Sequence, residues 1–301
     1  MSITFRQYNG LEDFDRIGDF LVENYQSGNQ DGNWLQPTWE YMHTHPSLDE
    51  TSLGKIGIWE DAGKIAAVAH YESQLGEAFF ELHTSYAHLK SRLLEYAEGQ
   101  LCGKTESGKR YLHAFVNDFD LAFEAEVKSR GYEKDERRAR PMSQWPIAHP
   151  FRPVVSLPDG FQLKSLADDN DFLKIHRVLW RGFNHVGEPP TDGVEERKKM
   201  QSGPHFRKDL TLVVEAPHGE FASYCGMWYE AKNQIAYVEP VATDPAFRRI
   251  GLGKAAVLEG IRRCGELGAR VAFVGSDQAF YQVLGFRTVF TSNCWAKRQE
   301  A

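Results

Sequence analysis

Apolar positions recur at two characteristic spacings along the chain, and the same order of elements is predicted twice. A strand-like segment at 3–8 precedes apolar residues at helical spacing, which are Phe14, Ile17, Phe20 and Leu21. A second strand-like segment at 161–163 precedes another such set, which is Phe172, Ile175, Val178 and Leu179. Each half of the chain is therefore predicted to begin with a strand followed by an amphipathic helix.

Each half continues with a predicted two-stranded hairpin. Apolar runs at 56–71 surround Gly63, and similar runs at 210–229 surround Gly219. Glycine between two strand-like runs is typical of a hairpin turn, because it adopts a positive φ without steric cost. The hairpins reinforce the view that one structural plan is used twice.

Further strands are predicted at 77–82 and 235–242, and late strands at 111–116 and 271–274. A short helix is expected after each late strand. Strands that alternate with helices in this order predict an α/β fold class. We therefore expect two modules, each with a central mixed β-sheet flanked by helices.

Prolines crowd the middle of the chain, at Pro141, Pro146, Pro150, Pro153 and Pro158. Proline lacks a backbone N–H and restricts the residue before it, so regular structure is not expected to continue through this stretch. We place a linker at 146–158, between an N-terminal module at 1–145 and a C-terminal module at 159–301. A chain of 301 residues suits two domains of ordinary size.

Composition and charge restrict the class of protein. The chain is 42% hydrophobic and 26% charged, as expected of a compact globular protein. A formal net charge of -7 and a pI near 5.9 favour neither nucleic acid nor membrane as a partner. The N-terminal sequence lacks the pattern of a signal peptide, and no apolar run is long enough to span a bilayer.

The cysteines and histidines predict neither disulfides nor a metal site. Cysteines 102, 225, 264 and 294 are scattered without a CxxC pair, so we expect reduced thiols and a cytoplasmic location. His43 and His45 lie in a tryptophan-rich segment that we interpret as a loop, and no further ligands accompany them. No metal is predicted.

The run from Arg248 to Lys254 combines glycines with basic residues where a strand gives way to a helix. Gly251 and Gly253 let the backbone approach a ligand closely, and the amides at a helix N-terminus attract anions. This pattern favours a site for a pyrophosphate. The alternative is an ordinary turn before a solvated helix, although neither a P-loop nor a dinucleotide-binding fingerprint is present.

Three features together resemble the GNAT superfamily of N-acetyltransferases: the strand Val238–Pro245, the RxxGxG run at 248–253, and Tyr281 ahead of Gly285-Phe286. The order of elements in the whole chain is similar to tandem GNAT proteins of the mycothiol-synthase type. The resemblance implies acetyl-CoA as acyl donor, with its pyrophosphate at the glycine-rich loop and its pantetheine arm along the preceding strand. The cofactor-binding residues that it implies are Val241, Ala242, Thr243, Arg248, Arg249, Ile250, Gly251, Leu252, Gly253 and Lys254.

Two residues are candidates for the acyl-transfer chemistry. The resemblance implies that Tyr281 protonates the departing CoA thiolate, a role that suits a phenol; the alternative is a core aromatic residue. Glu239 lies in an apolar strand, on the side of Tyr237 and Val241 by alternation, where desolvation would make it a useful base for an amine. The alternative for Glu239 is a structural carboxylate. Pro240 predicts a bulge or an edge in this strand.

The N-terminal module lacks both features of the acyl-transfer site. The segment 83–90 contains no glycine, and Val127 occupies the place that Tyr281 has in the other half. We therefore expect the N-terminal module to be degenerate and not to turn over acetyl-CoA. It would instead shape the acceptor pocket or form a homo-oligomer contact.

The acceptor is expected to be an amine, and a small molecule is the leading interpretation. Trp180, Phe183 and Trp228 are candidates for its pocket, although core packing is the commoner role of such residues. The function predicted from the sequence is direct, acetyl-CoA-dependent N-acetyl transfer. The alternative is a non-catalytic acyl-CoA-binding regulatory protein.

Overall fold

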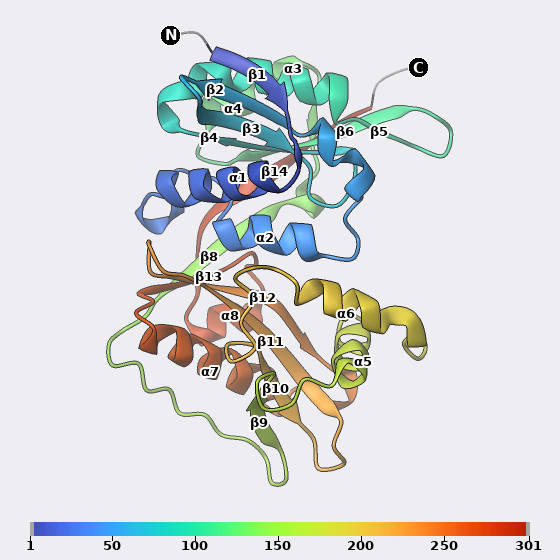
Figure 1. The fold of residues 1–301 in the computed structure, drawn as a ribbon, viewed down its shortest axis with the longest axis vertical. Coiled ribbons are helices and arrows are strands. Elements are labelled where there is room, and N and C mark those ends of the chain that lie inside the picture. Colours follow the sequence, from blue (N-terminus) through green and yellow to red (C-terminus); the bar gives the residue numbers. More distant parts are fainter. Residues whose placement is uncertain (1–2, 299–301) are drawn as a thin grey trace. The chain divides into compact units, whose positions relative to one another are not determined.

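The computed structural model describes residues 3–298, which form two compact units (Figure 1). Unit 1 contains the chain up to His43, then Ser47–Met142, and the chain from Thr288 onward; unit 2 contains Thr44–Pro46 and Ser143–Arg287. The last strand of the sequence therefore belongs to the sheet of unit 1. The strand β8 (Arg140–Pro146) ends the N-terminal half of the sequence, and its residues 143–146 pair with the sheet of unit 2.

The sheet of unit 1 has the order β1-β2-β3-β4-β6-β14. Only β4 and β6 run parallel, so the sheet is mixed. Its strands are β1 (Ile3–Gln7), β2 (Gly57–Asp61), β3 (Lys64–His70), β4 (Glu77–Leu82), β6 (Arg110–Asn117) and β14 (Arg287–Arg298), with the short β5 (Gly103–Lys104) and β7 (Glu133–Lys134) alongside. Its helices are α1 (Gly10–Asn24), α2 (Gln36–Thr44), α3 (Lys90–Gln100) and α4 (Leu121–Ser129).

One prediction for this unit is wrong. His43 lies in the helix α2 and not in a loop, and its ring contacts the backbone oxygen of Trp39 at 2.9 Å. Trp39 is fully buried in the core of the unit. Proline is well tolerated in the first turn of a helix, so Pro37 does not prevent α2 from forming.

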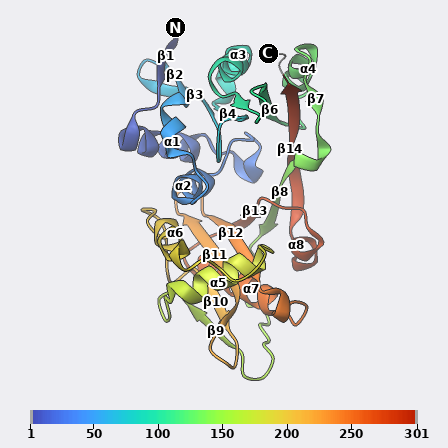
Figure 2. The ribbon, with the colours of Figure 1, turned by 90° about the vertical axis from the view of Figure 1, so that its right-hand side faces the viewer.

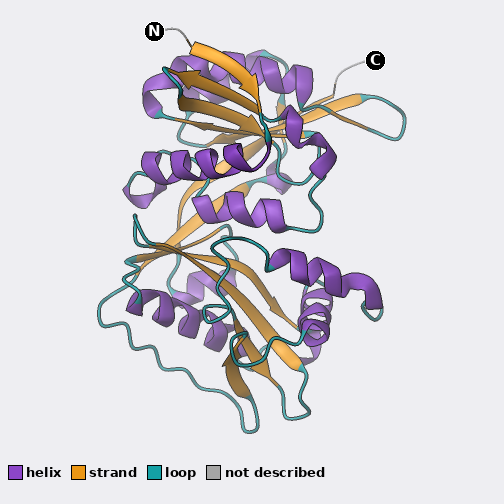
Figure 3. Ribbon diagram, in the orientation of Figure 1, coloured by secondary structure: helices purple, strands orange, loops and turns teal. Residues whose placement is uncertain are grey.

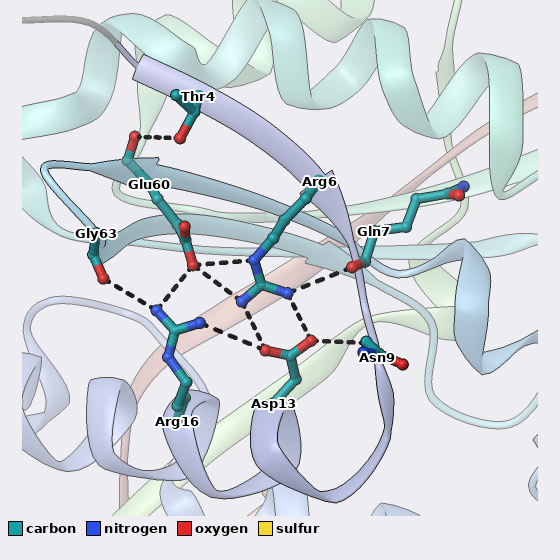
Figure 4. Close-up of polar contacts among 8 residues, drawn as sticks. All are labelled: Thr4, Arg6, Gln7, Asn9, Asp13, Arg16, Glu60 and Gly63. Atoms are coloured by element: carbon teal, nitrogen blue, oxygen red, sulfur yellow. Dashed lines mark hydrogen bonds and ion pairs between the residues drawn. The ribbon is translucent and has the colours of Figure 1, made fainter.

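An ion network joins the first strand, the first helix and the hairpin of unit 1 (Figure 4). Arg6 donates to both oxygens of Asp13 at 2.6 Å and to Glu60 at 3.1 Å. Arg16 reaches Glu60 at 2.8 Å. Burial opposes the charge of Asp13, but the Arg6 guanidinium outweighs it and holds the pKa of Asp13 below its usual value. A bidentate guanidinium pair of this kind is among the stronger polar contacts in proteins.

This network predicts an acid-sensitive contribution to stability. Because the pKa of Asp13 is depressed in the folded state, its contribution is present above about pH 4 and is lost as the pH falls below that value. Replacing Arg6 with methionine should cost about 2 kcal/mol near neutrality and flatten the acid dependence of the unfolding free energy. Urea denaturation at several pH values measures both effects.

The pair of Arg137 and Asp135 provides the control, since Arg137 is almost fully exposed. Replacing Arg137 with methionine should change neither the stability nor its pH dependence. An equal loss in the two variants would show that the Arg6 network has no special role.

The sheet of unit 2 has the order β8-β13-β12-β11-β10-β9, and only β12 and β13 run parallel. Its strands are β8 (Arg140–Pro146), β9 (Gln162–Ser165), β10 (Leu212–Glu215), β11 (Phe221–Glu230), β12 (Ile235–Thr243) and β13 (Val271–Val274). Its helices are α5 (Phe172–Gly182), α6 (Val194–Met200), α7 (Leu252–Glu266) and α8 (Ala279–Leu284). Figures 2 and 3 show the helices beside this sheet.

Two glycines set how closely helices approach this sheet. A Cβ at Gly260 of α7 would lie 2.5 Å from Met227, and one at Gly182 of α5 would lie 2.7 Å from the Cβ of Ala242. Met227 lies on the same face of β11 as Cys225, which is two positions away and pairs with Val241. Ala242 follows Val241 directly and pairs with Tyr224, so it lies on the opposite face. The helices α5 and α7 therefore cover the two faces.

The predicted fold class is confirmed, with mixed sheets flanked by helices in both units. Residues 147–161 contain neither helix nor strand, although the strand β8 includes Pro141 and Pro146. Among residues 3–298, no helix is long and apolar enough to cross a membrane. The same residues contain no group of three His, Cys, Asp or Glu side chains arranged to hold a metal ion.

Candidate active site

The strand β12 has a free edge where it diverges from its parallel neighbour. The pairing of β12 with β13 covers only Ile235–Tyr237. From Val238 to Thr243, the edge that faced β13 has no strand partner within the described part of the chain. Backbone donors and acceptors on such an edge need other partners, and a ligand can supply them.

A β-bulge marks the point of divergence, as Pro240 predicts. Met227 pairs with Val238 and Cys225 pairs with Val241, so Gly226 alone stands opposite Glu239 and Pro240. The extra residue reverses the alternation of side chains. Val241 consequently packs with Val238 in the core beneath α7, so simple alternation does not extend from Glu239 to Val241.

Gly226 makes this bulge possible, because a Cβ there would lie 2.3 Å from the carbonyl oxygen of Glu239. Replacing Gly226 with alanine should lower the free energy of unfolding by about 2–3 kcal/mol, since the clash is with backbone. Thermal and chemical denaturation measure the loss. Gly99→Ala is the control, because a Cβ at this position of α3 meets nothing within 4 Å. If the two variants were equally stable, the bulge would not depend on Gly226.

The loop after β12 ends at an open helix N-terminus. Asp244 caps the short 3-10 turn Pro245–Phe247, and the chain then reaches Gly251, the N-cap of α7, at φ +91°. No side chain caps α7, and its first backbone bond runs from the N–H of Ala255 to Gly251. The N–H groups of 251–254 are therefore left for a ligand or solvent, with the positive end of the helix dipole behind them.

The two glycines of the loop serve different purposes. Gly251 needs its positive φ, and a Cβ there would meet nothing within 4 Å, so the space outside the helix is open. Gly253 is buried, and a Cβ there would lie 3.0 Å from Thr243 Oγ1. Gly251 therefore leaves room for a ligand, whereas Gly253 lets the helix pack against the end of β12.

The basic residues of the loop also differ. Arg248 donates to the carbonyl oxygens of Thr243 and Gly182 at 3.0 and 2.8 Å, and to the side chain of Asn184 at 2.9 Å. It thereby joins the loop to the end of α5. Arg249 and Lys254 are exposed and, with Ile250, flank the open N-terminus, whereas Leu252 is buried in the core.

A buried ion pair fixes the start of the loop. Asp244 is fully buried and accepts from Arg181 of α5 at 2.5 Å and from the N–H of Ala246 at 2.9 Å. Burial alone would raise the pKa of Asp244, but Arg181 outweighs it and lowers that pKa. The sequence does not predict this pair, because its members are 63 positions apart.

Tyr281 lies in α8 with 9% of its surface exposed, and its ring contacts those of Phe280 and Phe286. Its hydroxyl has no hydrogen-bond partner among residues 3–298. Burial, followed by the negative charge of Glu239, raises the pKa of Tyr281. The phenol therefore stays protonated at neutral pH, and Glu239 lies close enough to influence it.

Two cysteines, Cys225 and Cys264, lie in the core of unit 2. Cys225 is fully buried on β11, and burial raises the pKa of its thiol. Burial likewise raises the pKa of Cys264 to about 12. Because the thiolate is the nucleophilic form, neither side chain is suited to carry an acyl group.

The three aromatic candidates for an acceptor pocket have different surroundings. Trp180 stacks on His185 and donates to the carbonyl oxygen of Gly187, within its own loop. Phe183 is half exposed. Trp228 is buried and donates to the carbonyl oxygen of Glu239 at 3.0 Å, so it supports the bulge.

The corresponding segment of unit 1 is closed. After β4, the 3-10 helix Thr84–Leu89 continues directly into α3, and the N–H of Lys90 donates to Ala87. Val127 is fully buried in α4. The start of α3 thus lacks the open helix N-terminus that α7 has.

Comparisons with known proteins agree with this geometry. Residues 172–286 match the model of the acetyltransferase (GNAT) family. No curated protein matches the chain as a relative. Among solved structures, a GCN5-related N-acetyltransferase from Sphaerobacter thermophilus is similar at a TM-score of 0.66 and 14% identity, over 98% of this chain and 95% of that one.

Two further structures have the same fold. A tandem GNAT protein from the clavulanic acid biosynthesis pathway has a TM-score of 0.64 at 13% identity, over 100% of this chain and 99% of that one. A glucosamine N-acetyltransferase region in a fungal multi-domain β-N-acetylglucosaminidase has a TM-score of 0.58 at 13% identity, over 98% of this chain and 38% of that one. The chain therefore has the fold of tandem GNAT proteins, and its residues 172–286 are similar to the acetyltransferase (GNAT) family.

Proposed function

We propose that the C-terminal module binds acetyl-CoA and transfers its acetyl group directly to an amine of a small-molecule acceptor. The observation that carries this proposal is the uncapped N-terminus of α7 beside the free edge of β12. The pyrophosphate is held by the backbone N–H groups of 250–254, with Arg249 and Lys254 supplying charge. The pantetheine arm pairs with the edge at 241–243.

The acceptor amine must lose a proton before it attacks, because an alkylammonium ion is not a nucleophile. Glu239 stands at the bulge and takes this proton, directly or through water. The amine nitrogen then bonds to the thioester carbonyl carbon. The carbon–sulfur bond breaks as the tetrahedral intermediate collapses.

Tyr281 donates its phenolic proton to the departing thiolate and regains a proton from solvent. Its raised pKa keeps that proton in place until the thiolate forms. The buried, protonated thiols favour direct transfer over an acyl-cysteine intermediate. The four unpaired cysteines support a cytoplasmic location for this activity.

We further propose that the N-terminal module does not turn over acetyl-CoA. The closed start of α3 and the absence of a tyrosine at Val127 support this division. Its contribution lies in shaping the acceptor site or in forming a homo-oligomer.

The test is calorimetry with acetyl-CoA, followed by a panel of amines in which released CoA is read with a thiol reagent. Binding together with amine-dependent CoA release supports the proposal. Tight binding with no release by any amine class would favour a non-catalytic acyl-CoA-binding regulatory protein. Absence of binding would contradict both functions.

A further inference from the structure

A cavity opens in unit 1 where β4 and β6 diverge. The two strands pair in parallel only at Glu77–His113 and Ala78–Ala114. Beyond these pairs, a cavity of about 250 Å³ lies between the ends of the strands, the start of α3 and the loop around Asp31. In unit 2, the corresponding strands β12 and β13 diverge in the same way at the proposed acyl-CoA site.

The cavity does not suit the pyrophosphate of CoA. The backbone N–H of Lys90 already donates to the carbonyl oxygen of Ala87, within the 3-10 helix that precedes α3. No glycine-rich turn adjoins the cavity at this point. The ammonium group of Lys90 forms an ion pair with Asp120, so its charge is already compensated. A phosphate would therefore find neither open amides nor a free cation at this point.

The remaining charged group of the lining is the carboxylate of Asp31. Its oxygens accept from the backbone N–H groups of Gln26 and Asn33 at 2.9 and 3.2 Å, and no cation within residues 3–298 pairs with it. Burial, to which the charge of Glu81 adds, raises the pKa of Asp31. The cavity wall thus holds one carboxyl group without a cationic partner in a partly desolvated place, where a bound cation is stabilised more than in water.

Aromatic rings form much of the wall. Phe80, Phe119 and Phe123 all line the cavity, and Phe119 is half exposed at its side. Aromatic faces attract cations and also bury apolar groups. The side chain of Asn117 donates to the carbonyl oxygen of Gly32 at 2.9 Å, which leaves its amide oxygen to accept a further bond.

We propose that this cavity is a binding site for a small organic ammonium ion, with the cationic group against Asp31 and an apolar body against the phenylalanine rings. The volume is below the range of about 300–1,000 Å³ that suits drug-sized ligands, so a ligand of about ten non-hydrogen atoms fits. The site is separate from the proposed acyl transfer and needs no acyl-CoA.

The test titrates the full chain, without acyl-CoA, with 2-phenylethylammonium and with its neutral analogue 2-phenylethanol. Calorimetry should give an affinity for the ammonium ion at least about ten-fold higher than for the alcohol. Asp31→Asn should reduce this preference to near unity. Asp19→Asn is the matched control, because it makes the same change of charge on an exposed position of α1 outside the cavity.

A second variant tests the location of the ammonium site and changes no charged residue. Ala87 is an exposed residue of the lining, and Ala87→Trp should fill the cavity and abolish binding of the ammonium ion at an unchanged melting temperature. The proposal is overturned if the ammonium ion does not bind, if the alcohol binds equally well, or if Ala87→Trp leaves binding intact. Loss of acetyl-CoA binding in Ala87→Trp would also overturn it, because the cavity would then belong to the acyl donor.

Discussion

Replacing Tyr281 with phenylalanine should lower kcat for acetyl transfer by about 100-fold or more, with little change in the dissociation constant of acetyl-CoA. The substitution removes one oxygen atom and keeps the ring between Phe280 and Phe286. The hydroxyl makes no hydrogen bond within residues 3–298, so its loss should not disturb the fold. Steady-state kinetics at saturating amine, with calorimetry for acetyl-CoA, separates the two quantities.

Tyr229 provides the control in the same unit. Its hydroxyl donates to the carbonyl oxygen of Leu267 at 2.7 Å, on the surface. Tyr229→Phe should leave kcat unchanged. If Tyr281→Phe turned over as fast as the wild type while chemistry limited the rate, Tyr281 would not be the acid.

Replacing Gly251 with valine should weaken acetyl-CoA binding by about 100-fold. A β-branched residue is strained at φ +91°, which distorts the N-terminus of α7. Its side chain would also enter the open space where the proposed pyrophosphate lies. Calorimetry with acetyl-CoA gives the affinity directly.

Gly219→Val is a closely matched control. Gly219 also has φ +91° and open surroundings, but it lies in the β10–β11 hairpin. The two variants should lose similar stability, and only Gly251→Val should lose affinity. Equal affinities would place the acyl-CoA site elsewhere.

Sequence patterns predict the local elements of this fold well because the periodicity of apolar residues records which face of each element is buried. The hairpins around Gly63 and Gly219 and the helices α1, α5 and α7 follow from such patterns. The placement of β14 and β8 does not follow, since strand pairing depends on residues far apart in the chain. Nothing in the residues 287–298 indicates that they pair with β6.

The sequence predicts the part of the candidate site that lies within a single segment of the chain. The open start of α7 lies within one run of residues, and glycine with basic neighbours is its direct signature. The bulge opposite Gly226 changes the side of the sheet on which Val241 lies. A single proline predicts a bulge, but it does not predict which side chains change sides. The anchor formed by Asp244 and Arg181 requires the three-dimensional fold.

We propose that one module of two binds the acyl donor, through the start of α7. Hydrogen exchange of the full chain with and without acetyl-CoA tests it most directly. We predict slower exchange of the amides at 250–254 when acetyl-CoA is bound, and no change at 84–90 in the corresponding segment of unit 1. Protection at 84–90 with none at 250–254 would show that the acyl donor binds to unit 1 instead.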